Sequence, residues 1–256
     1  MVRYVVDVPA SYAGSADKRY PVVYALHGLF EGESFWERRG LAAILARLRQ
    51  QGTVKDFLVV AVDGGNSFFL NGRLGAYQDL VTRDLVAEVE SHYRVVPGRA
   101  GRALLGVSMG GYAALRIAFT DPGRFAAVAT HSAMLLETIP SQTEGAGRWQ
   151  MSAFEAAFGS PIDKDVWAAA DPLRLAEGID KAAAPALYSD CGTGDRYGLA
   201  AGHRRLDEKL TARGVRHTLE LAPGDHGYEF VKSRLETSLL FLDRALGSAS
   251  APRSAR

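Results

Sequence analysis

Ser108 stands at the centre of the segment Gly106–Gly110, which reads Gly-Val-Ser-Met-Gly. An apolar run precedes this segment, and a run of helix-forming residues, 111–118, follows it. A Gly-x-Ser-x-Gly motif between a strand and a helix is typical of a sharp turn that holds the serine hydroxyl clear of the backbone at the carboxyl end of a sheet. Side chains at the flanking glycines would push the strand and the helix apart. We therefore predict that Ser108 acts as a nucleophile.

A serine hydroxyl is a weak nucleophile at neutral pH and needs a general base, most often a histidine. Of the six histidines, His226 has the most suitable position, in the loop Pro223–Gly227 after the last predicted strand. Flanking glycines allow the backbone to carry its imidazole across the strand ends, so we predict that His226 is the base. Among the others, His131 directly follows a predicted strand and is the one that can approach the site. We expect His92, His203 and His217 to be surface or partly buried residues, and the ring of His27 to form hydrogen bonds with the backbone.

The base needs an acid that orients its ring and favours its charged form. Asp190 and Asp195 both follow the predicted strand 185–189, and both precede His226, as the order serine, acid, histidine requires. Asp195 lies beyond two glycines on a loop that can reach sideways, so it is preferred, with Asp190 at the strand tip as the alternative. Asp225 adjoins His226 and would point away from the site when the imidazole points in.

An oxyanion that forms during acyl transfer needs two backbone amides. Met109, at the start of the helix after the serine, is predicted to supply one of them. The second is expected from the loop after the strand 21–26, with Leu29 as the choice and Phe30 as its neighbour. Four aromatic residues are candidates for the substrate pocket, with ordinary packing as the alternative for each: Phe30, Trp36, Phe68 and Phe69.

These candidate residues share one position in the predicted architecture, because each group follows a strand. The pattern of apolar runs and amphipathic segments predicts strands at 2–8, 21–26, 57–62, 102–107, 125–130, 185–190 and 217–221, and helices at 34–51, 78–93, 111–118, 200–213 and 228–246. This alternation predicts an α/β fold with a mostly parallel, doubly wound sheet and helices on both faces. Right-handed crossovers then bring the strand ends, and the candidate residues, to one edge of that sheet.

The length of 256 residues predicts one domain over 1–247, with residues 248–256 as a disordered tail. Residues 134–178 interrupt the alternation and carry Trp149, Phe154, Phe158 and Trp167. We expect this segment to be a helical excursion that crosses the sheet and lines the substrate site, or else a surface insertion with its own apolar cluster.

Composition and charge narrow the class of protein. A net charge of +1 with dispersed arginines argues against a nucleic-acid surface or a polybasic membrane patch, and the single cysteine excludes an internal disulfide.

No apolar stretch is long enough for a membrane span and the first residues alternate like a strand, so we expect a cytoplasmic protein without membrane contact. Metal-binding and phosphate-loop motifs are absent from the sequence, and no cofactor is expected. The oligomeric state does not follow from the sequence.

Several separated motifs resemble the esterase D family of α/β-hydrolases. They are, in chain order, Tyr20–Gly28 with Trp36, Gly106–Tyr112, Asp171–Leu173, Asp190–Asp195 and Pro223–His226. That family includes carboxylesterases, feruloyl and acetyl-xylan esterases, S-formylglutathione hydrolases and the mycolyltransferases of the antigen 85 group. The resemblance implies an α/β-hydrolase fold, a triad of Ser108, His226 and Asp195, and an oxyanion hole formed by the amides of Leu29 and Met109.

The expected activity is therefore that of a serine carboxylesterase acting on small-molecule esters with short or aromatic acyl groups. The loop after Gly28 lacks the cysteine usual in S-formylglutathione hydrolases. An acyltransferase of the antigen 85 type and an S-formylglutathione-type thioesterase are the alternatives, because both use the same acyl-enzyme. A binding protein that retains the fold without catalysis is disfavoured, since every member of the triad is present.

Overall fold

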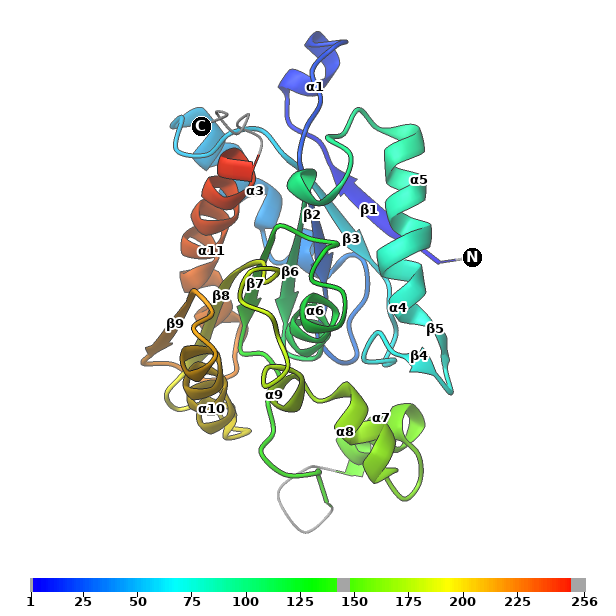
Figure 1. Cartoon of the computed structure of the whole chain (residues 1–256). Coiled ribbons are helices and arrows are strands. Elements are labelled where there is room, and N and C mark those ends of the chain that lie inside the picture. The colour runs from blue at the N-terminus through cyan, green and yellow to red at the C-terminus, as the bar shows by residue number, and fades with distance from the viewer. Residues whose placement is uncertain (1, 142–147, 250–256) are drawn as a thin grey trace.

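The computed structural model describes residues 2–141 and 148–249, and its centre is a seven-stranded sheet (Figure 1). The strands follow the order β1-β3-β2-β6-β7-β8-β9, and β1 alone is antiparallel to its neighbour. Their bounds are β1 Tyr4–Asp7, β2 Val22–Leu26, β3 Leu58–Val62, β6 Arg102–Val107, β7 Ala127–His131, β8 Ala186–Gly192 and β9 His217–Ala222. A small hairpin of β4, Asn71–Gly72, and β5, Gly75–Ala76, lies apart from this sheet.

Helices cover both faces of the sheet. On one face lie α3, Leu41–Gln50, and α11, Tyr228–Ala249, and on the other lie α5, Leu85–His92, α6, Met109–Thr120, and α10, Leu199–Ala212 (Figure 1). Shorter helices are α1 Ser11–Gly14, α2 Phe35–Arg38, α4 Tyr77–Asp79, α8 Lys164–Ala170 and α9 Pro172–Leu175; α7 spans Arg148–Phe158. Every residue of β2, β3 and β7 is buried, as continuous apolar runs covered on both faces require. The predicted mostly parallel, doubly wound sheet is confirmed.

Two predicted helices differ in the structure. The helix expected over 34–51 is broken into α2 and α3, because Gly40 between them takes a left-handed φ of 79°. Ser34, the first residue of the predicted helix, makes no capping hydrogen bond. The helix expected over 78–93 contains a π-helical turn, Leu80–Asp84, between α4 and α5.

At the end of the chain, α11 continues past Gly247 to Ala249 instead of ending at the glycine. Of the predicted tail, residues 250–256 lie outside the described residues. Across the described ranges, no helix is both long and apolar enough to span a bilayer.

Helices α7, α8 and α9 fall in the segment predicted to leave the sheet (Figure 1). Phe154 and Phe158 of α7 pack on Phe68, which follows β3, and Phe158 also contacts Tyr112 of α6. Trp167 of α8 closes this aromatic cluster, whose members belong to the main core on this face of the sheet. The cluster therefore fixes α7 near the carboxyl ends of the strands. The side chain of Trp149 lies outside the described residues.

Candidate active site

Ser108 occupies the turn between β6 and α6 and has a backbone conformation that is unusual for a residue with a side chain. Its φ and ψ are 53° and −115°, and its amide donates to the His131 carbonyl at 3.0 Å. A Cβ on Gly106 would lie 2.3 Å from the Gly110 carbonyl oxygen, and one on Gly110 would lie 2.3 Å from that of Leu26. Both glycines are therefore required, because only bare backbone fits between strand and helix at this turn.

His226 lies between Ser108 and Asp195 and forms a hydrogen bond with each. Its Nε2 is 3.0 Å from Ser108 Oγ, and its Nδ1 is 2.8 Å from Asp195 Oδ2. A carboxylate can only accept, so Nδ1 carries a proton and Nε2 is left to accept from the serine hydroxyl. The three side chains come from the ends of three different elements, and the fold brings them into one hydrogen-bonded chain. The edge of the Tyr197 ring packs on the imidazole, with centroids 4.7 Å apart.

The carboxylate of Asp195 is buried, and burial by itself would raise its pKa. The hydrogen bond and charge of His226, together with the Tyr197 amide at 2.9 Å, outweigh that effect and hold the pKa of Asp195 below its ordinary value. Cys191 also approaches Asp195 Oδ2, at 3.6 Å. Burial and the Asp195 charge raise the pKa of this thiol to about 12, so the cysteine remains a proton donor to the carboxylate. Asp195 is therefore ionised in the folded protein near neutral pH.

Asp190, the alternative acid, is buried on the other side of β8 and bonds His131 instead of His226. The distance from His131 Nδ1 to Asp190 Oδ2 is 2.9 Å, and the Tyr188 hydroxyl donates to the same oxygen at 2.9 Å. The other ring nitrogen of His131 lies 2.9 Å from Ser238 Oγ on α11. The ring of His131 thus faces the α11 layer, and only its backbone carbonyl contacts Ser108.

Asp225 directs its carboxylate to the preceding loop and not to the imidazole. Its Oδ1 accepts from the Arg196 amide at 3.0 Å and the Arg196 Nε at 3.1 Å, and its Oδ2 accepts from the Arg196 guanidinium. The His226 amide donates to Oδ1 at 2.6 Å. The Arg196 hydrogen bonds, followed by the His226 amide, lower the pKa of Asp225 to about 2. Arg196, which follows Asp195, is therefore joined to Asp225, which precedes His226, so the loops that carry the acid and the histidine are linked.

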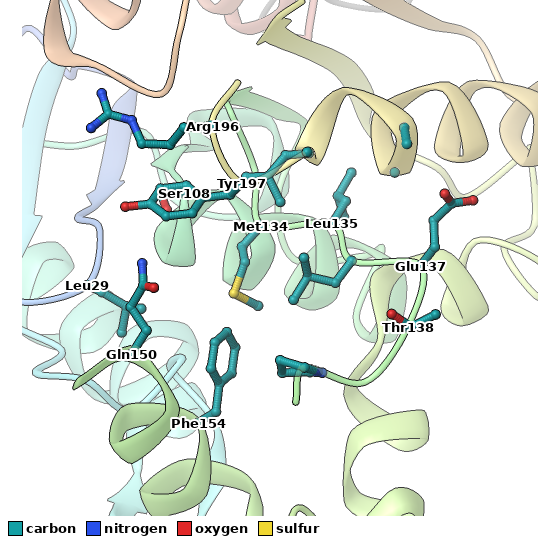
Figure 2. Close-up of a pocket in the computed structure, with 16 residues that line it drawn as sticks. Leu29, Ser108, Met134, Leu135, Glu137, Thr138, Gln150, Phe154, Arg196 and Tyr197 are labelled. Atoms are coloured by element: carbon teal, nitrogen blue, oxygen red, sulfur yellow. The ribbon is translucent and has the colours of Figure 1, made fainter. Parts of the chain in front are cut away.

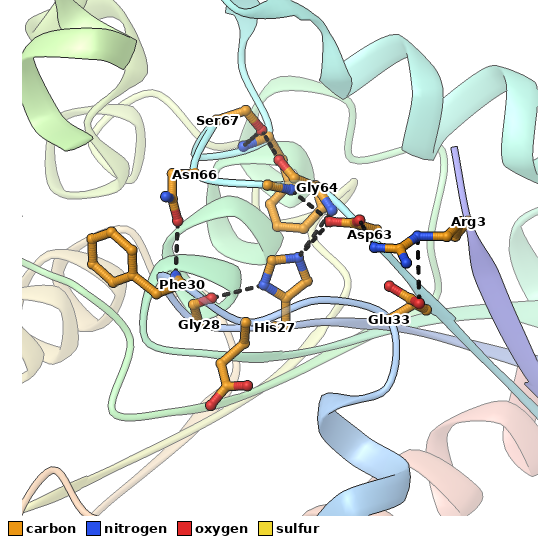
Figure 3. A network of polar contacts seen from close by, with 12 residues as sticks. Arg3, His27, Gly28, Phe30, Glu33, Asp63, Gly64, Asn66 and Ser67 are labelled. Carbon is orange, nitrogen blue, oxygen red and sulfur yellow. Dashed lines mark hydrogen bonds and ion pairs between the residues drawn. The ribbon is translucent and has the colours of Figure 1, made fainter. Parts of the chain in front are cut away.

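The loop after β2 is fixed by a polar network around His27 (Figure 3). His27 Nδ1 donates to the Gly28 carbonyl at 2.7 Å, and Nε2 accepts from the Gly64 amide at 2.9 Å, so the ring is backbone-bonded as predicted. Burial lowers the pKa of His27, which is consistent with a neutral ring. The Phe30 amide donates to Asn66 Oδ1 at 2.8 Å.

The hydrogen bond from the Phe30 amide to Asn66 distinguishes the two candidate oxyanion-hole amides of the loop after β2, those of Leu29 and Phe30. The amide of Phe30 is occupied by Asn66, whereas the Leu29 amide has no acceptor within the described part of the chain. The Met109 amide, in the first turn of α6, is likewise without an acceptor there. Leu29 and Met109 are therefore the amides available to a ligand oxygen beside Ser108.

Two cavities meet at Ser108, which lines both of them together with Leu29, Gln150 and Tyr197. The first, which we call the Met134 cavity, has a volume of about 370 Å³ and extends from Ser108 past Met134 to Glu137 and Thr138 (Figure 2). Its apolar walls come from the segment after β7 and from α7 and α10: Met134, Leu135, Leu136, Phe154 and Leu199.

The second, which we call the His226 cavity, has a volume of about 210 Å³. His226 and Tyr228 line one wall, and the loop and helix after β2 line the other with Phe30, Glu31, Phe35 and Arg39. His226 lines this cavity and not the Met134 cavity. The two cavities thus differ in their access to the imidazole.

The structure places three of the four aromatic pocket candidates in the core, which corrects the prediction for them. Phe68 and Phe69 have 0% of their surface exposed and Trp36 has 1%, and none of them lines either cavity. Phe68 stacks on Phe154 of α7, Phe69 packs on His27 in the loop after β2, and Trp36 belongs to the same buried cluster as the apolar residues of α3. Phe30 is 48% exposed and lines the His226 cavity.

Sequence reasoning missed most of the residues that line the cavities. Met134 lies three residues beyond the end of β7, and Tyr197 and Tyr228 each lie two residues beyond Asp195 and His226. The signal available was position, since each follows a strand at the same edge of the sheet. Among the described residues, no group of three or more His, Cys, Asp or Glu side chains is arranged to hold a metal ion.

A parallel sheet with a serine on the turn after a central strand, bonded to a histidine and an acid from later strands, defines the α/β-hydrolase class of folds. The chain belongs to the family described as "Putative esterase", whose model matches residues 2–242.

Two curated relatives differ from the chain in length. An endo-1,4-beta-xylanase/feruloyl esterase of Xylanibacter ruminicola is 30% identical over 114 residues, which cover 42% of this chain and 16% of that protein. Esterase MT1326 of Mycobacterium tuberculosis is 24% identical over 254 residues, covering 90% of this chain and 54% of that protein. The chain thus spans about half of one relative and less of the other.

Two solved structures share the fold. A ferulic acid esterase superposes with a TM-score of 0.78 at 24% identity, over 95% of this chain and 92% of that one. An S-formylglutathione hydrolase from Agrobacterium tumefaciens superposes with a TM-score of 0.75 at 22% identity, over 96% and 90% of the two chains. The predicted resemblance to this group of α/β-hydrolases is confirmed.

Proposed function

We propose that this protein is a serine esterase that hydrolyses carboxylic esters through an acyl-enzyme on Ser108. The observation that carries the proposal is the hydrogen-bonded chain from Ser108 Oγ through His226 to Asp195, at 3.0 and 2.8 Å, beside an apolar cavity. Membership of an esterase family supports the same reaction class.

In this mechanism the ester carbonyl carbon lies against Ser108 Oγ, with its oxygen toward the amides of Leu29 and Met109. Nε2 of His226 takes the hydroxyl proton as Oγ attacks, and Asp195 stabilises the resulting imidazolium. The two amides stabilise the oxyanion of the tetrahedral intermediate. His226 then gives its proton to the leaving oxygen, and the acyl group remains on Ser108. A water deprotonated by His226 attacks the acyl-enzyme, releases the acid and restores the serine.

The size and lining of the Met134 cavity support a short-chain or single-ring aromatic acyl group as the substrate class. The cavity holds about 370 Å³ and is walled by Met134, Leu135 and Phe154, which favour an apolar ligand. Hydrolysis of 4-nitrophenyl esters of increasing acyl length tests this directly. We expect turnover that falls once the acyl chain exceeds the cavity, and covalent labelling of Ser108 by a fluorophosphonate probe.

The Ser108→Ala variant is the matched control, since it removes only the attacking oxygen. It is expected to lose both turnover and labelling while its unfolding temperature stays near that of the parent. A folded parent protein that is neither labelled nor active on any ester of the series would contradict the proposal. Product analysis with added alcohol or thiol acceptors separates hydrolysis from acyl transfer, because both reactions start from the same acyl-enzyme.

A further inference from the structure

The two cavities beside Ser108 have different roles if the proposed esterase mechanism holds. When the tetrahedral intermediate collapses, the bond between the carbonyl carbon and the leaving oxygen breaks, and His226 Nε2–H delivers its proton to that oxygen. The leaving group must therefore lie within reach of the imidazole. His226 lines only one of the two cavities, so the His226 cavity receives the leaving group and the Met134 cavity receives the acyl group.

Arg39 is the one arginine that lines the His226 cavity in the described part of the chain. Its guanidinium carbon lies 4.6 Å from the ring centroid of Tyr228 and 5.5 Å from that of Phe35. The Tyr228 hydroxyl also donates to the Arg39 backbone carbonyl, which ties α2 to the start of α11. The side chain is 36% exposed, so these contacts hold the guanidinium in place beside the cavity without removing it from solvent. Stacking on aromatic faces leaves the edge N–H groups of a guanidinium free to donate.

Most of the hydrogen-bonding capacity of Arg39 is unused. Within the described residues its side chain makes one hydrogen bond, from a terminal nitrogen to Glu31 Oε1 at 3.4 Å. Its Nε is buried and has no acceptor. A buried donor without a partner is costly, and natural structures contain few of them. The buried Nε is out of reach of a ligand, and the donors available to one are the remaining N–H groups of the terminal nitrogens.

Glu31 also lines this cavity and would oppose an anion if it stood alone. It is paired with two arginines, through Oε2 to Arg38 at 2.5 Å and through Oε1 to Arg39. The three side chains together carry a net charge of +1. Arg38 does not line the cavity and is 57% exposed, so the cation that faces the leaving-group side is Arg39.

We propose that Arg39 binds a carboxylate on the leaving group, so that the preferred substrates are esters whose alcohol or phenol portion is an anionic hydroxy acid. A guanidinium donates two parallel hydrogen bonds to a carboxylate, which fixes both the distance and the plane of the ligand. This proposal depends on the esterase function proposed above. The proposal specifies the charge of the leaving group, whereas membership of the esterase family indicates only which bond is cleaved.

The test uses two acetate esters that differ in one group. In 3-acetoxybenzoate the leaving phenol carries a carboxylate, and in 3-acetoxybenzamide it carries a neutral amide of similar size. We expect the parent protein to prefer the anion, and Arg39→Gln to lower the anion-to-amide ratio of kcat/KM roughly tenfold, as loss of a charge-assisted hydrogen bond implies. The loss should fall mainly on KM, because the carboxylate is held equally in ground and transition states.

Arg38→Gln is the matched control, because it removes the other cation from Glu31 and leaves the cavity lining intact. Its ratio should stay within about twofold of the parent ratio, as expected for an exposed ion pair. Arg39→Lys should recover part of the preference, since it restores the charge without the planar fork. Salt should weaken the preference in the parent protein and not in Arg39→Gln.

The outcomes separate the two proposals. If the parent hydrolyses both esters with equal kcat/KM, or if Arg39→Gln and Arg38→Gln lower the ratio equally, the assignment of Arg39 is overturned while the esterase function stands. If the parent hydrolyses neither ester and is not labelled at Ser108 by a fluorophosphonate, the esterase function itself fails.

Discussion

The molecule contains two arrays of serine, histidine and aspartate linked in the same order. In the first, His226 joins Ser108 and Asp195 at 3.0 and 2.8 Å. In the second, His131 joins Ser238 and Asp190, each at 2.9 Å. Distances between the side chains therefore do not distinguish the array proposed to be catalytic from the buried one.

Access from the cavities does distinguish the two arrays. Ser238, His131 and Asp190 are all fully buried between the sheet and α11, and none of them lines the Met134 cavity or the His226 cavity. The Ser238 hydroxyl lies within hydrogen-bond distance of both the Leu235 carbonyl in its own helix and His131 Nε2, each at 2.9 Å. Ser108 lines two cavities, and its hydroxyl has His226 as its one partner among the described residues. The strained turn at Ser108 supplies this exposure, whereas a helix interior cannot.

The largest difference in kcat is expected between the alanine variants of Ser108 and Ser238. Ser108→Ala should lower kcat at least about a thousandfold with little change in unfolding free energy, because it removes only the nucleophile. Ser238→Ala should leave kcat within about twofold and cost about 1–3 kcal/mol of stability, because a buried ring nitrogen of His131 loses its partner. Steady-state kinetics and urea unfolding of both variants measure this contrast. Loss of activity in a fully folded Ser238→Ala protein would refute it.

Substitution of the two aspartates should show the same contrast, with a loss of activity for Asp195 and a loss of stability for Asp190. Asp195→Asn is expected to lower kcat on the order of 10⁴-fold, since the amide favours the wrong tautomer of His226. Asp190→Asn should lower stability by about 1–3 kcal/mol, because the buried donors of His131 and Tyr188 lose a carboxylate acceptor, and retain activity in the protein that folds. Thermal unfolding followed by kinetics below the transition checks both. An active Asp195→Asn protein beside an inactive, folded Asp190→Asn protein would reverse the assignment of the acid.

The smallest effect is expected from the ion pair that links the loops of Asp195 and His226. Asp225→Asn should lower kcat by no more than about fivefold, since the pair with Arg196 is exposed to solvent. The pKa of Asp225 is lowered to about 2, so its contribution is complete above the ordinary aspartate pKa and is lost as pH falls toward 2. The stability difference between parent and variant should therefore be constant at neutral pH and vanish near pH 2. A difference that disappears already near pH 6 would show that another group is responsible.

Much of the fold could be predicted because its determinants are local. Continuous apolar runs such as Val22–Leu26 indicate buried strands, and Gly214 ends α10 at the predicted place with a φ of 66°. The break at Gly40 was missed because a glycine within an amphipathic pattern does not reveal whether its φ will be positive. Phe68 and Phe69 were wrongly predicted to line a pocket for a related reason, since an aromatic residue looks the same in a sequence whether it faces a ligand or the core.

The serine turn could be predicted from local sequence alone, since Gly106 and Gly110 are needed wherever a strand meets a helix this closely. The sequence also placed His226 and Asp195 after strands in the required order. The choice of acid depends on packing: the Asp190 side chain points from β8 to His131, whereas Asp195 lies on the loop after β8, which carries it to His226. The tertiary structure likewise decided which cavity adjoins the imidazole, since the walls of that cavity come from segments that are far apart in the chain and are brought together by packing.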